Sequence, residues 1–107
     1  MKITEVRISL CHEEKLKAFA NVTFDEEFVV RGLKVIEGRS GLFVSMPSRR
    51  RSDGTYQDIA HPITSKMRSE LEAAVVSAYE AELQAAQERK GQQEQQEQQE
   101  QQEPQED

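Results

Sequence analysis

The sequence predicts an α+β fold, in which a mostly antiparallel β-meander of four to five strands is followed by one long C-terminal helix. Two observations predict it. Through much of residues 1–60, apolar and polar residues alternate with the period of a half-buried strand. From residue 63 onwards, apolar residues recur at the spacing of a helix instead.

The predicted strands begin near the N-terminus. "TEVRISL" and "LKAFANVTF" both alternate and are close enough in sequence to form an antiparallel hairpin, which the acidic run "DEE" ends. "FVVRGLKVI" is rich in β-branched residues and predicts a third strand, where Gly32 marks a bulge or a close backbone approach. The turn "EGRSG" leads into a fourth strand, "LFVSM", which Pro47 closes. "TYQDIA" is a candidate fifth strand and ends before Pro62.

The helix is predicted to begin at Thr64 or Ser65 as N-cap and to stop at Gly91. About 27 residues at 1.5 Å each give a helix of ~40 Å. This is longer than one small sheet requires, so its last turns should project or meet a partner chain. Its many alanines either permit a close helix neighbour or reflect helix propensity alone.

Charge divides the chain into two parts. Residues 1–90 hold all 14 bases and 14 of the 20 acids, so the net charge of −6 arises from residues 91–107. That segment repeats Gln-Gln-Glu without an apolar side chain, which predicts a disordered, acidic Gln/Glu-rich tail behind a single domain over 1–90. An aggregating Gln-rich segment is the alternative, which the charge at every third position opposes.

Several function classes find no support in the sequence. Cys11 is the only cysteine, so no disulfide or zinc-binding quartet is predicted, and it is interpreted as a small apolar residue. Asp58 and His61 lie three apart but have no nucleophile beside them. We therefore predict neither an enzyme nor a cofactor, metal or small-molecule substrate. The N-terminal segment is too short and charged for a signal peptide or membrane span, which predicts a cytoplasmic protein without a membrane partner.

Residues 39–52 form a local basic patch in this neutral domain, with Arg39, Arg49, Arg50 and Arg51 and no acid among them. Arg49, Arg50 and Arg51 are consecutive, and guanidinium groups bind phosphate oxygens as a fork. Tyr56 could stack on a base, and Lys66 and Arg68 stand at the start of the helix, where backbone amides favour anions. These residues form one surface if the arginine loop folds back toward the helix start. The alternative is a solvated loop whose charges only confer solubility.

Three segments carry a resemblance to a known family. "FVVRGLKVIEG", "GLFVSMPSRR" and "DIAHPI" closely resemble the SpoVG family, the stage V sporulation protein G or septation protein of bacteria, and the resemblance runs from about Met1 to Leu83. It implies a small homodimer that binds DNA and RNA and regulates sporulation and asymmetric septation. The Gln/Glu run departs from the family pattern.

Resemblance and charge together predict that Arg49, Arg50 and Arg51 are the main phosphate contacts, supported by Lys66 and Arg68. The alternative is a protein-interaction module that acts on division or regulatory machinery without binding nucleic acid. The acidic tail either competes with nucleic acid for the arginines or serves only as a solubilising appendage.

Overall fold

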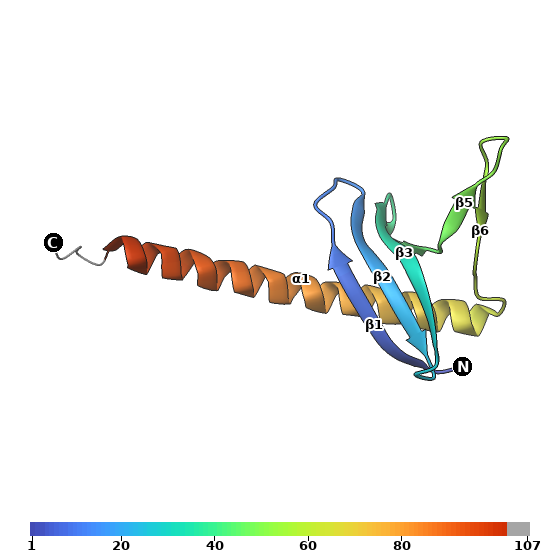
Figure 1. The fold of residues 1–107 in the computed structure, drawn as a ribbon, viewed down its shortest axis with the longest axis horizontal. Coiled ribbons are helices and arrows are strands. Elements are labelled where there is room, and N and C mark those ends of the chain that lie inside the picture. The colour runs from blue at the N-terminus through green and yellow to red at the C-terminus, as the bar shows by residue number, and fades with distance from the viewer. Residues whose placement is uncertain (103–107) are drawn as a thin grey trace.

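The computed structural model describes residues 1–102, and Figure 1 shows their fold. A four-stranded sheet contains β1 (Ile3–Leu10), β2 (Leu16–Phe24), β3 (Phe28–Gly38) and β4 (Gly41–Ser45). Two short strands, β5 (Ser48–Arg50) and β6 (Tyr56–Asp58), form a separate sheet, and α1 (Ser65–Gln102) follows. The predicted α+β class, an antiparallel meander followed by one long helix, is confirmed.

The meander has the strand order of the sequence, because each strand pairs antiparallel with the next. The predicted bulge at Gly32 is present: Ala20 pairs with Leu33 and Val22 with Val30, so β3 has an extra residue there. Gly32 has a φ of 84°, and its N–H donates to Asn21 Oδ1 at 3.3 Å. The bulge reverses the alternation along β3, which keeps the apolar side chains on both sides of it facing the core.

The core lies between one face of the sheet and α1, which crosses that face in Figure 1. Three helical residues spaced four apart meet the alternating residues of the two central strands, as a helical stripe against a strand face requires. The buried side chains are Ala18, Ala20, Val22, Phe24, Leu33, Val35, Leu71, Val75 and Tyr79.

The N-terminal end of α1 lies where the sequence predicts it, but the C-terminal end does not. Thr64 is the N-cap, since its Oγ1 accepts a hydrogen bond of 3.1 Å from the Met67 N–H. The predicted stop at Gly91 is wrong, because α1 continues to Gln102. Glutamine and glutamate are good helix formers, and an interior glycine costs only about 1 kcal/mol, so the helix passes through it. Residues 91–107 were predicted to form a disordered tail, and residues 91–102 of this segment are part of α1. Residues 103–107 lie outside the described residues.

The candidate fifth strand also differs from the prediction in its partner. Tyr56–Asp58 does not extend the meander but pairs antiparallel with Ser48–Arg50. Pro47 separates β4 from β5, since proline lacks the N–H that a continuing ladder needs, and the chain leaves the large sheet there. The arginine triplet consequently starts in a strand, where the sequence had suggested a loop.

Candidate nucleic-acid interface

The predicted phosphate contacts lie on a small hairpin, here called the arginine hairpin, which consists of residues 48–58. Its base is closed by a hydrogen bond of 2.7 Å from the Ile59 N–H to the Pro47 carbonyl. In the part of the chain that the structure describes, β5 and β6 pack on neither the four-stranded sheet nor α1. Figure 1 shows the hairpin projecting from the body of the molecule, so both of its faces are open to a large ligand.

Backbone and side-chain hydrogen bonds fix the turn of the arginine hairpin. The Arg51 N–H donates to the Thr55 carbonyl at 2.7 Å, and the Gly54 N–H donates to the Arg51 carbonyl at 3.0 Å. Gly54 has a φ of 89°, which favours glycine. Asp53 Oδ1 accepts from the Thr55 hydroxyl at 2.6 Å and from the Thr55 N–H at 3.0 Å. A turn with this many local bonds orients Arg51 and the two arginines of β5, although a lone hairpin is weakly stable.

The Asp53 carboxylate makes the turn sensitive to acid. The hydrogen bond from the Thr55 side chain, and next the one from its backbone, lower the pKa of Asp53 from its ordinary value. Because the folded pKa is depressed, the stabilisation of the turn is fully present above the unfolded pKa of about 3.9 and is lost as the pH falls through the folded value. Thr55→Val removes the hydroxyl donor, so we expect the pKa of Asp53 to rise, as measured by NMR titration of its carboxyl carbon.

Ser52→Ala is the matched control for this titration, because Ser52 makes no side-chain hydrogen bond to Asp53 in the described residues. The control variant should leave the midpoint of Asp53 unchanged. A midpoint that does not move in Thr55→Val would show that the hydroxyl does not hold the turn.

The hairpin register separates the arginines onto different sides. Arg50 pairs with Tyr56, so these two side chains lie on the same face of the hairpin, whereas Arg49 pairs with Gln57 and points to the other face. Arg51 lies at the turn. All three arginines are exposed, and Tyr56 is 71% exposed. Among the described residues, the four ion pairs that form use other cations. The three guanidinium groups are therefore available to a polyanion.

Lys66 and Arg68 lie in the first turns of α1 and are also exposed. Lys66 Nζ is 4.0 Å from Glu70 Oε1, a long and exposed pair that holds the ammonium weakly. The assumption that the arginine loop folds back toward the helix start is wrong: the turn of the hairpin points away from it in Figure 1. The reason is the pairing of β5 with β6, because two paired strands keep residues 48–58 extended, and an extended hairpin cannot fold back as a loop could. Within one copy, Arg50 and Tyr56 lie opposite each other on paired strands, whereas the arginine triplet does not form one surface with Lys66 and Arg68.

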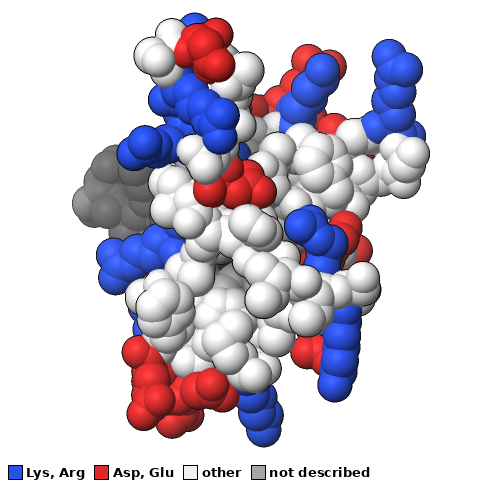
Figure 2. Space-filling model, turned by 90° about the vertical axis from the view of Figure 1, so that its right-hand side faces the viewer, with Lys and Arg blue, Asp and Glu red and all other residues white. Residues whose placement is uncertain are grey.

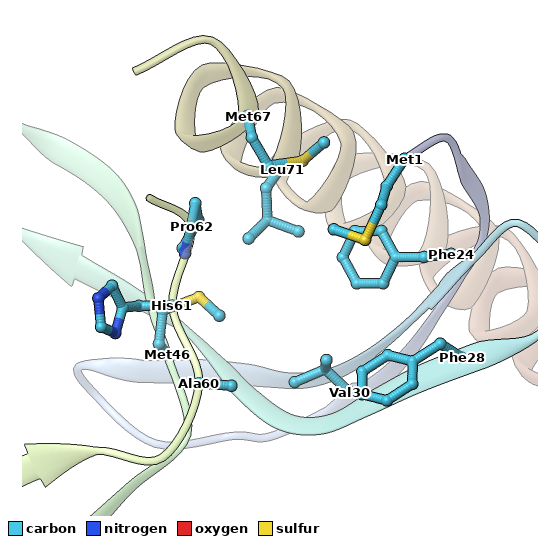
Figure 3. Close-up of a pocket in the computed structure, with 10 residues that line it drawn as sticks. All are labelled: Met1, Phe24, Phe28, Val30, Met46, Ala60, His61, Pro62, Met67 and Leu71. Carbon is cyan, nitrogen blue, oxygen red and sulfur yellow. The ribbon is translucent and has the colours of Figure 1, made fainter. Parts of the chain in front are cut away.

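An apolar surface at the same end of the molecule was not predicted from the sequence. It surrounds a cavity of about 150 Å³, whose lining side chains Figure 3 shows. Two of its lining side chains are exposed, Met1 by 75% and Phe28 by 63%. On either side of the lining segment 60–62, Ile59 and Ile63 are exposed by 67% and 91%. We call these four residues the apolar end surface. Figure 2 views this end of the molecule and shows a wide uncharged area with charged side chains around it. The sequence signal was the apolar residues that flank His61-Pro62.

His61 lies next to this surface. His61 lines the cavity at the base of the arginine hairpin, while Asp58 lies in β6, and no hydrogen bond between them is formed. Within residues 1–91, whose side chains the structure describes, no group of three or more His, Cys, Asp or Glu side chains is arranged to hold a metal ion. Across residues 1–102, no helix combines the length and the apolar character needed to cross a membrane.

Comparison with known proteins matches the part of the chain that forms this fold. The family model for SpoVG matches residues 1–81. A protein of Anaeromyxobacter sp. strain Fw109-5 is 52% identical over 83 residues, 78% of this chain and 86% of its own length. Proteins of Myxococcus xanthus and Bdellovibrio bacteriovorus are 49% and 51% identical, over 81% and 79% of this chain and 88% and 79% of their own lengths. All three are provisionally named septation protein SpoVG. The chain belongs to the SpoVG family.

Proposed function

We propose that this protein is a regulator of sporulation and septation that binds DNA or RNA in the cytoplasm. The names of the relatives support the process, since they are provisionally called septation proteins. The observation that carries the nucleic-acid activity is the arginine hairpin: three exposed guanidinium groups on a projecting element, none in an ion pair among the described residues. Such groups gain most from phosphate oxygens, which accept their forked hydrogen bonds.

The arrangement of the hairpin suits a backbone contact rather than base reading. Arg49 and Arg50 point to opposite faces, so each face of the hairpin presents a cation to a phosphate backbone. Tyr56 lies beside Arg50 and offers a ring for stacking. Phosphate contacts fix position and affinity but carry no sequence information. We therefore expect weak sequence preference from the arginine hairpin itself.

A mobility-shift experiment at low salt tests the proposal. The full chain is titrated against random duplex DNA, single-stranded DNA and RNA, and binding to at least one of these ligands is expected. If none is bound, the alternative of a protein-interaction module, which docks on division or regulatory proteins, replaces the proposal. In that case the arginines would meet acidic side chains of a protein partner.

We also propose that two copies pair through the apolar end surface. A body of about 90 residues buries only somewhat more than 60% of its unfolded surface, so further burial between copies is favourable. A symmetric pair would cover the same patch on each copy and bring six arginines to one assembly. The most exposed member, Ile63, contributes little to its own copy, because 91% of its surface is open.

Ile63→Glu is therefore expected to shift the protein from dimer to monomer without unfolding it. A charged side chain would have to lose its hydration to enter an apolar interface. Sedimentation velocity measures the shift, and circular dichroism confirms the fold. Gln87→Glu, which adds the same charge at an exposed helical position, should stay dimeric. A wild-type chain that sediments as a monomer at all concentrations would contradict the proposal.

A further inference from the structure

The face of the four-stranded sheet opposite α1 carries two exposed aromatic rings. Phe19 on β2 is 39% exposed and Phe43 on β4 is 43% exposed. Ile36 connects them: it pairs with Phe43 and lies two residues beyond Lys34, which pairs with Phe19. We call this surface the outer sheet face. Figure 1 views it with α1 behind the sheet, and in the described part of the chain α1 is the one element that packs on these strands.

Exposed rings on the face of a sheet are informative, because their apolar surface stays in contact with water and adds no stability to the fold. Each Å² of apolar surface removed from water contributes about 25 cal/mol, which these rings do not gain within one copy. Scattered exposed apolar residues need no explanation, but a contiguous patch of them marks an interaction surface. Ile36 and Phe43 pair with each other on β3 and β4, and Phe19 on β2 lies diagonally from Ile36, so the three side chains form a patch across three strands.

The ring of Phe43 contacts the backbone of the neighbouring strand β3. It lies against Gly38, where a Cβ would come within 3.0 Å of Cε1. Any larger residue at position 38 would push the ring away, so the glycine allows it to lie flat on β3. Ile36, Gly38 and Phe43 also line an open depression of about 630 Å³, wide enough for a planar group.

The charges of the outer sheet face favour an anionic ligand. Lys34 and Arg31 are exposed and form no ion pair in the described residues, and Lys34 lies directly opposite Phe19. The row that contains Phe19 consists of Ser9, Phe19, Lys34 and Ser45, without an acid. Glu5, farther along β1, is neutralised by Arg7 at 2.6 Å. At the depression, Lys15 and Arg39 stand beside Glu14 and Glu37, and Glu37 is paired with Lys17 at 3.3 Å.

We propose that the outer sheet face is a second binding surface, on which Phe19 and Phe43 stack bases of single-stranded nucleic acid while Lys34 and Arg31 contact its phosphates. Aromatic rings interleaved with cations on an open sheet match what a single strand presents: unpaired bases with flat apolar faces, joined by anions. A duplex keeps its bases stacked inside and cannot use these rings. The inference rests on the proposed function and adds a ligand class to it, because the arginine hairpin alone does not distinguish single strands from duplexes.

Tryptophan fluorescence tests the proposal directly, since the chain contains no tryptophan. Phe19→Trp and Phe43→Trp each place one reporter on the outer sheet face and keep an aromatic ring there. The probe is an oligothymidylate of about 15 nucleotides, the upper range of sites bound by small single-strand-binding folds. We expect its addition to quench both reporters. Gln84→Trp is the control, because Gln84 is exposed on α1, which packs on the other face of the sheet. Its emission should not change.

The outcomes separate this inference from the proposed function. If the oligonucleotide binds, as seen by mobility shift, but leaves the Phe19→Trp and Phe43→Trp emission unchanged, the stacking surface is rejected and the arginine hairpin stands. If the full chain binds no nucleic acid, both proposals fail. If the emission shifts with protein concentration alone, the outer sheet face is a contact between copies and the inference is overturned.

Leucine variants supply a second measurement. It distinguishes stacking on the rings from a purely structural role of the two phenylalanines, which would affect single-strand and duplex binding equally. Phe19→Leu with Phe43→Leu keeps apolar side chains on the sheet but removes the flat rings. We expect binding of the oligonucleotide to weaken about tenfold or more, since one stacked base corresponds to about 1–3 kcal/mol. Duplex binding should stay within about twofold of the wild type. Equal losses for single strand and duplex would overturn the assignment.

Discussion

Replacement of Arg49, Arg50 and Arg51 together by alanine is expected to weaken nucleic-acid binding by roughly 100-fold or more at about 0.1 M salt. The three guanidinium groups are exposed on the projecting hairpin and form no ion pair in the described residues, so their loss leaves no buried partner behind. In a symmetric dimer the change removes six cations, and each lost phosphate contact removes the entropy of counterion release. Mobility shifts against random duplex, single-stranded DNA and RNA measure the effect.

A triple variant at Lys2, Arg89 and Lys90 is the control for net charge. These three cations are exposed and lie outside the arginine hairpin, in the N-terminal segment and in α1. Their replacement by alanine changes the net charge by the same amount and should lower affinity far less. Equal losses in the two variants would mean that overall charge, and not the hairpin, determines binding.

Leu33→Ala is expected to destabilise the fold by about 2–5 kcal/mol, which is a large part of the roughly 5–15 kcal/mol that a small domain has. Leu33 is fully buried on β3, where it pairs with Ala20 and packs in the core beneath α1. Removal of its branched end leaves a cavity that the neighbouring strands cannot close, because their register is fixed. Urea unfolding monitored by circular dichroism gives the change in the free energy of unfolding.

Leu42→Ala makes the same chemical change at a partly buried position on the edge strand β4. Leu42→Ala should lower the free energy of unfolding by roughly half as much, since less buried apolar surface is lost and an edge strand can move to fill the space. Similar losses at both positions would show that the core is not centred on the two inner strands.

Local pattern was sufficient to predict the sheet and the helix. The alternation in "TEVRISL" and "LKAFANVTF", the glycine at position 32 and the cap at Thr64 each act through short-range sterics or hydrogen bonds, which sequence displays directly. The end of α1 was mispredicted because Gly91 was treated as a stop, although the residues that follow it favour a helix.

The binding residues could be identified by type but not placed. The arginine triplet and Tyr56 are visible in the sequence, but their relation depends on the pairing of β5 with β6. That pairing follows from the turn at Asp53-Gly54 and from Pro47, yet the direction in which the hairpin projects is a tertiary property. The outer sheet face and the apolar end surface were missed for the same reason: they gather side chains from strands and connections far apart in the chain.

The salt dependence of binding tests the central claim most directly. If about five phosphates are neutralised by the dimer, the logarithm of the binding constant should fall with the logarithm of salt concentration at a slope near −4.5 for duplex DNA. The slope should become much shallower when Arg49, Arg50 and Arg51 are alanine. A wild-type slope near zero, or a slope that the triple substitution leaves unchanged, would contradict binding through the arginine hairpin.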